Sequence, residues 1–82
     1  MKLLHTMIRV KNIDESLKFY TELLNMKLDH KKRLEDCWLY FLNDEEKSTQ
    51  LELTYNDETP KEGYNLGNGF GHLAFSVKSF DE

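Results

Sequence analysis

The period of the hydrophobic pattern changes twice along the chain, and this order of periods limits the possible folds. In residues 3–10, a mainly aliphatic set at every second position alternates with a set that includes His5 and Arg9, and this period of two is that of a strand. Apolar residues then recur at the spacing of a helix, namely Ile13, Leu17, Tyr20 and Leu24. Strand-like segments follow over 26–34, 37–42 and 49–55, the first two joined around Glu35-Asp36 as a hairpin. The sequence therefore predicts an α+β domain of one strand, one helix and three strands.

Length and charge exclude several classes of protein. The 82 residues are enough for one domain at most, and they are too few for a doubly wound nucleotide-binding fold or a TIM barrel. With 15 acidic and 11 basic residues the net charge is −4, so neither nucleic acid nor an anionic membrane is an expected partner. No apolar run reaches the ~20 residues of a membrane span. His5 and Arg9 interrupt the N-terminal apolar segment, so no signal peptide is expected, and Cys37 is the single cysteine. These features favour a cytoplasmic protein.

Capping residues set the expected ends of the helix. Asn12 or Asp14 can cap the N-terminus, and Glu15 stands three residues after Asn12, as in a capping box. Asn25 suits a left-handed C-terminal cap. We expect a helix over 14–24, with its apolar stripe packed on the aliphatic face of strand 3–10.

The C-terminal part of the chain resembles the N-terminal part. After a loop over 56–69, residues 70–77 alternate like a strand, and Ser79 to Glu82 resemble the start of a helix. His72 precedes Val77-Lys78 at the same spacing that separates His5 from Val10-Lys11. This is a weak internal repeat in which the second copy stops after its first strand.

Three potential metal ligands lie on the non-core faces of three predicted strands: His5, Glu52 and His72. Two imidazoles and a carboxylate can bind Zn²⁺, Ni²⁺, Co²⁺ or Fe²⁺ and leave positions open for water or substrate. Each side chain alone could equally be a solvated residue on a polar face. His30 lies in the charged segment 29–33 and is predicted to be a surface residue.

Two further residues stand four positions beyond a candidate ligand on the same strand face. Arg9 follows His5, and Asn56 follows Glu52. Four strand residues span roughly 13 Å, so a ligand bound to a metal at one end could place an anionic or amide-rich end at both. Alternatively, Arg9 forms a surface ion pair and Asn56 opens a turn.

Four segments together resemble the bacterial glyoxalase I (lactoylglutathione lyase) family, part of the vicinal oxygen chelate superfamily. They are Leu-His-Thr-Met-Ile-Arg-Val at 4–10, Ser-Leu-Lys-Phe-Tyr at 16–20 with Leu-Asn-Met-Lys-Leu at 24–28, Leu-Glu-Leu-Thr-Tyr-Asn at 51–56, and Gly-His-Leu-Ala-Phe-Ser-Val at 71–77. The resemblance implies a βαβββ module of the glyoxalase/bleomycin-resistance fold over 1–56. It also implies a linker over 57–69 and the first strand of a second, truncated module within 70–82.

The same resemblance implies roles for particular residues. His5, Glu52 and His72 match three of four metal ligands, and Arg9 and Asn56 match positions that hold the glutathione part of the substrate. The fourth ligand, a glutamate that is also the better general-base candidate, would lie beyond Glu82. Glu52 is then the only carboxylate at the site. Among divalent ions, Ni²⁺ or Co²⁺ is expected in preference to Zn²⁺.

The implied activity is isomerisation of the methylglyoxal–glutathione hemithioacetal to S-lactoylglutathione, with a divalent ion as Lewis acid. A carboxylate would move a proton between adjacent carbons. We also expect a homodimer with a shared metal site, in which His72 completes a site whose His5 and Glu52 belong to the other chain. Two alternatives stay open: an Fe²⁺ extradiol dioxygenase, and a non-enzymatic drug-binding module.

Overall fold

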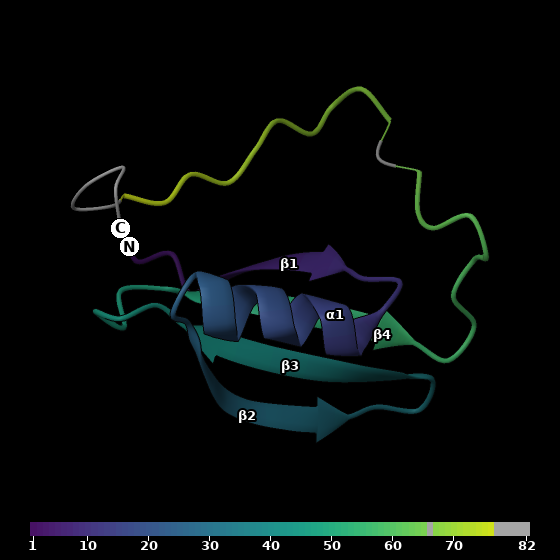
Figure 1. Cartoon of the computed structure of the whole chain (residues 1–82), viewed down its shortest axis with the longest axis horizontal. Coiled ribbons are helices and arrows are strands. Elements are labelled where there is room, and N and C mark those ends of the chain that lie inside the picture. The colour runs from purple at the N-terminus through teal and green to yellow at the C-terminus, as the bar shows by residue number, and fades with distance from the viewer. Residues whose placement is uncertain (66, 77–82) are drawn as a thin grey trace.

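The computed structural model describes residues 1–65 and 67–76, which contain one four-stranded sheet with a helix across one face (Figure 1). The strands are β1 (His5–Arg9), β2 (Lys27–Arg33), β3 (Cys37–Asn43) and β4 (Gln50–Asn56). Their order in the sheet is β1-β4-β3-β2, with β1 parallel to β4 and the other neighbours antiparallel. The predicted βαβββ module is therefore confirmed.

The helical segment begins and ends close to the predicted residues. Helix α1 (Ile13–Lys18) starts after Asn12, whose side-chain oxygen accepts a hydrogen bond from the Glu15 N–H at 3.1 Å. It continues as the π-helix η1 (Phe19–Leu23), a widening that the spacing of apolar residues does not predict. Asn25 has φ 57°, the left-handed conformation expected of the C-terminal cap.

The core lies between the helix and the two central strands. Leu42 of β3 and Leu53 of β4 are fully buried, and Val10, Met26 and Leu51 complete the buried cluster. All four residues of the predicted helix stripe pack against this cluster: Ile13, Leu17, Tyr20 and Leu24. Ile8 of β1 packs against the same cluster and Val10 belongs to it, so the helix stripe meets the aliphatic side of this segment together with β3 and β4.

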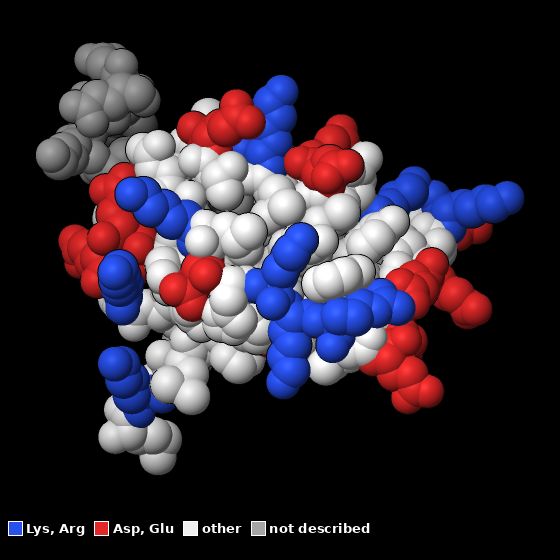
Figure 2. Space-filling view, turned by 90° about the horizontal axis from the view of Figure 1, so that it is seen from below, with Lys and Arg blue, Asp and Glu red and all other residues white. Residues whose placement is uncertain are grey.

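β2 forms one edge of the sheet and is exposed along its whole length. It carries Lys27, Lys31, Lys32 and Arg33, and Figure 2, seen from this side, shows basic side chains gathered in the middle of the surface. Charged side chains on an edge strand hinder pairing with a strand of another molecule. The free edge of β2 is therefore protected from edge-to-edge association.

The predicted strand over 70–77 is wrong for residues 70–76, which the structure places in no strand. Figure 1 shows this segment passing outside β1, apart from the sheet, and Phe70, Leu73 and Phe75 are exposed. Alternation alone does not form a strand, because the backbone also needs a partner for its hydrogen bonds. Val77 and the predicted helix start at 79–82 lie outside the described residues.

The described helical segment is short: α1 and η1 together run from Ile13 to Leu23. In the part of the chain that the structure describes, no helix has the length and apolar character needed to cross a membrane.

Candidate metal and substrate site

The parallel pairing of β1 with β4 brings two of the predicted ligands together on the sheet face opposite the helix. Met7 lies beside Glu52 in the register, so His5 and Glu52 are diagonal neighbours on this face. The His5 Nε2 is 3.1 Å from the Glu52 Oε1. Glu52 is buried, with 8% of its surface exposed, whereas the His5 side chain is half-exposed. The carboxylate is thus largely shielded from solvent, whereas the imidazole is partly open to it.

The distance between these two side chains suits joint ligation of one divalent ion. An imidazole nitrogen and a carboxylate oxygen each bind such an ion at about 2.0–2.2 Å. At the ligand angles of tetrahedral or octahedral sites, the two ligand atoms would then be roughly 2.8–3.6 Å apart. The 3.1 Å separation falls within that range. His5 and Glu52 therefore fit two ligands of a cation site.

His72, the third predicted ligand, is not brought to this pair. It lies in segment 70–76, which forms no strand, and it is exposed. Among residues 1–65 and 67–76, no group of three or more histidine, cysteine or acidic side chains is arranged to hold a metal ion. The structure thus assembles two of the three predicted ligands.

Arg9 and Asn56 lie at the carboxyl ends of β1 and β4, which coincide because the strands are parallel. Arg9 is exposed, while Asn56 is partly buried and donates a hydrogen bond through Nδ2 to the Tyr64 hydroxyl at 2.8 Å. Its carbonyl accepts a bond from the Thr59 hydroxyl at 2.8 Å, so Asn56 also opens a turn. The two candidate substrate residues therefore share one end of the sheet, beyond the His5–Glu52 pair.

Sequence reasoning missed two neighbours of the candidate ligands. The buried Thr54 hydroxyl donates to the Glu52 Oε2 at 3.3 Å. Phe41 pairs with Glu52 across the strands, and its ring meets the His5 ring edge-on at a centroid distance of 5.7 Å. The only sequence signal for the contact of Thr54 with Glu52 was the Glu-x-Thr spacing at 52–54, since residues two apart on a strand share a face.

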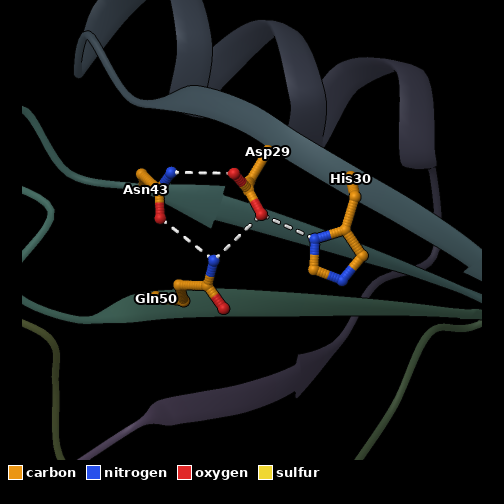
Figure 3. A network of polar contacts seen from close by, with 4 residues as sticks. All are labelled: Asp29, His30, Asn43 and Gln50. Carbon is orange, nitrogen blue, oxygen red and sulfur yellow. Dashed lines mark hydrogen bonds and ion pairs between the residues drawn. The ribbon is translucent and has the colours of Figure 1, made fainter.

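His30 is exposed, as predicted, but it belongs to an ordered polar network (Figure 3). A register shift between Leu28 and His30 places Asp29 at a bulge, so its carboxylate lies beside the His30 Nδ1 at 2.7 Å. Asn43 and Gln50 also donate to this carboxylate. The hydrogen bond from His30, with those from Asn43 and Gln50, lowers the pKa of Asp29. The His30 ring stacks on Phe41 at 4.5 Å.

One hollow among the described residues lies away from the candidate ligands. It is bordered by Leu23, Leu24 and Met26 at the end of the helix, by the 44–51 segment and by residues 73–76. Neither His5 nor Glu52 lines it.

Residues 2–82 match the Glyoxalase/Bleomycin resistance protein/Dioxygenase superfamily, and the chain belongs to that family. The four-stranded mixed sheet with its helix is one module of the corresponding fold.

Several relatives within this family are similar to the chain over most of its length. A lactoylglutathione lyase of Neisseria meningitidis is 48% identical over 81 residues, covering 94% of this chain and 57% of the relative. A probable lactoylglutathione lyase of Synechocystis is 46% identical over 82 residues, covering 95% of this chain and 61% of the relative. The solved structure of the trypanothione-dependent glyoxalase I of Leishmania major superposes with a TM-score of 0.82 at 40% identity, covering 99% of this chain and 60% of that one. The chain thus spans about three fifths of the length of these relatives.

Proposed function

We propose that the protein is a glyoxalase I, which isomerises the hemithioacetal of methylglyoxal and glutathione to S-lactoylglutathione. The observation that carries the proposal is the His5–Glu52 pair, 3.1 Å apart on the open face of the sheet. Relatives that bear the name lactoylglutathione lyase are 39–48% identical to the chain over nearly its whole length. The pair supplies a place for a Lewis acid, and the relatives indicate which reaction uses it.

In this proposal His5 and Glu52 hold a divalent ion, and His72 is the third ligand. The ion would supply Lewis acidity to the two adjacent oxygens of the substrate. Glu52 keeps its carboxylate fixed in a buried position and supplies negative charge to the ion. The reaction also needs a carboxylate that accepts the proton from one substrate carbon and returns it to the next.

Arg9 and Asn56 would bind the thiol-peptide end of the substrate. The guanidinium of Arg9 suits a carboxylate of that peptide, and the Asn56 side-chain oxygen suits one of its amide N–H groups. Their position at one end of the sheet supports this role, because it leaves roughly the length of the peptide between them and the ion.

We further propose Ni²⁺ or Co²⁺ rather than Zn²⁺ as the resident ion, and a homodimer in which His72 of one chain joins His5 and Glu52 of the other. The exposure of His72, away from the His5–Glu52 pair, is compatible with ligation between chains. A cytoplasmic location is part of the same proposal and agrees with the buried, unpaired Cys37.

The test is an assay of the intact protein loaded with Ni²⁺, Co²⁺ or Zn²⁺ in turn. Methylglyoxal and glutathione should give the lactoyl thioester. Its formation is measured by absorbance and by mass spectrometry. His5→Ala should abolish turnover and tight Ni²⁺ binding, whereas His30→Ala, a histidine on the same face that touches neither ligand, should retain both. Ring opening of a catechol with Fe²⁺ would favour a dioxygenase. No metal bound at saturating Ni²⁺ or Zn²⁺ would favour a drug-binding module.

A further inference from the structure

The carboxylate of Glu52 is held at both of its oxygens. The Oε1 lies 3.1 Å from the His5 Nε2, and the Oε2 accepts a hydrogen bond from the Thr54 hydroxyl at 3.3 Å. Both residues of this second contact are buried, Glu52 with 8% and Thr54 with 5% of its surface exposed. Water therefore has little access to replace the Thr54 hydroxyl.

The side chains beside Thr54 offer its hydroxyl few other hydrogen-bond acceptors. Its neighbours across the strands are Arg9 on one side and Leu39 on the other, and Leu39 offers no acceptor in its side chain. A threonine is β-branched, so its χ1 angle has few allowed values. The hydroxyl is consequently fixed in direction, and that direction is toward Glu52.

We propose that Thr54 is a positioning residue that sets the orientation of the Glu52 carboxylate and thereby the affinity of the site for a divalent cation. The inference rests on the proposed metal role of His5 and Glu52. The terminal torsion of a glutamate is broad and roughly two-fold, so a carboxylate without a second partner samples several orientations. Thr54 restricts that torsion and keeps Oε1 directed at His5 before the cation arrives. Substituting a group that holds a metal ligand in this way typically weakens metal binding by roughly 10–100-fold.

The experiment compares three substitutions in the intact protein by calorimetric titration with Ni²⁺. Thr54→Val keeps the shape of the side chain and removes the hydroxyl, and it should weaken Ni²⁺ binding by roughly 10–100-fold. Thr54→Ser retains the hydroxyl and should bind Ni²⁺ about as tightly as the parent protein. Thr6→Val is the matched control, because Thr6 lies on the neighbouring strand and alternates to the opposite face. It should leave the affinity unchanged.

A second readout separates positioning from simple stabilisation. The absorption spectrum of the Co²⁺-loaded protein reports the geometry around the ion, and Thr54→Val should alter its shape while Thr54→Ser restores it. A urea midpoint measured without metal gives the stability of each variant. If Thr54→Val lowers stability and leaves the Ni²⁺ affinity and Co²⁺ spectrum unchanged, the positioning role is overturned.

His5→Ala in the same titration identifies which proposal has failed. If His5→Ala weakens Ni²⁺ binding and Thr54→Val does not, the metal site stands and the role of Thr54 is wrong. If His5→Ala also leaves Ni²⁺ binding unchanged, the metal site itself is wrong, and the role of Thr54 falls with it.

Discussion

Leu53 lies between Glu52 and Thr54 on β4, and its burial should contribute strongly to the stability of the module. Its side chain is fully buried between Ile8 of β1 and Tyr40 of β3. Leu53→Ala removes three carbon atoms, a loss of about 2.4 kcal/mol in transfer free energy at ~0.8 kcal/mol per carbon. The cavity left behind raises the expected loss to about 3–4 kcal/mol.

This loss is large relative to the stability of a domain of this size. At about 0.05–0.15 kcal/mol per residue, such a chain has roughly 4–12 kcal/mol in total. Urea unfolding followed by circular dichroism should therefore show a much lower midpoint for Leu53→Ala with an unchanged slope. Leu23→Ala, at a residue 67% exposed, should change the free energy of unfolding by less than about 0.5 kcal/mol. Equal midpoints for the two variants would refute the assignment of Leu53 to the core.

Three further predictions concern a helix cap, an ion pair and a binding residue. Asn12→Ala should lower the free energy of unfolding by about 1 kcal/mol in urea titrations, because the Glu15 N–H loses its acceptor. Arg33 donates two hydrogen bonds to Asp57 and lowers the pKa of that carboxyl, so the pair stabilises the fold above about pH 4 and the benefit is lost as the pH falls through the lowered value. The stability difference between the parent protein and Asp57→Asn should therefore shrink in acid, and a difference that persists at pH 2 would contradict this. Arg9→Ala should raise KM for the hemithioacetal far more than it lowers kcat, and an unchanged KM would remove Arg9 from the site.

Local signals predicted the elements well. Asn12 caps the helix and Asn25 ends it, because each conformation is specified by a side chain and the few residues around it. The Glu35-Asp36 turn joins β2 and β3 for the same reason. The π-helical widening at Phe19–Leu23 escaped prediction, since apolar spacing of three and four fits either type of helix over so few residues.

The candidate site was only partly predicted. The reason is that the positions of its residues depend on strand order as well as on periodicity. Alternation placed His5 and Glu52 on polar faces, but only the insertion of β4 beside β1 brings them to 3.1 Å. His30 and Phe41 meet because of the bulge at Asp29, which no pattern in the sequence marks. For His72, the alternation of 70–77 predicted a strand, but residues 70–76 pair with no other strand, so the predicted third ligand is not brought to the pair.

The parallel pairing of β1 with β4 also determines when the site can form during folding. The β2–β3 hairpin joins residues close in the sequence, whereas His5 and Gln50 pair across 45 residues. Closing the longer loop costs more entropy, so we expect the hairpin and β4 to assemble first and β1 to dock last. Met7 then meets Glu52, and His5 reaches the carboxylate, only in this final step. A cation that bridges His5 and Glu52 would consequently slow unfolding and leave the rate of folding nearly unchanged.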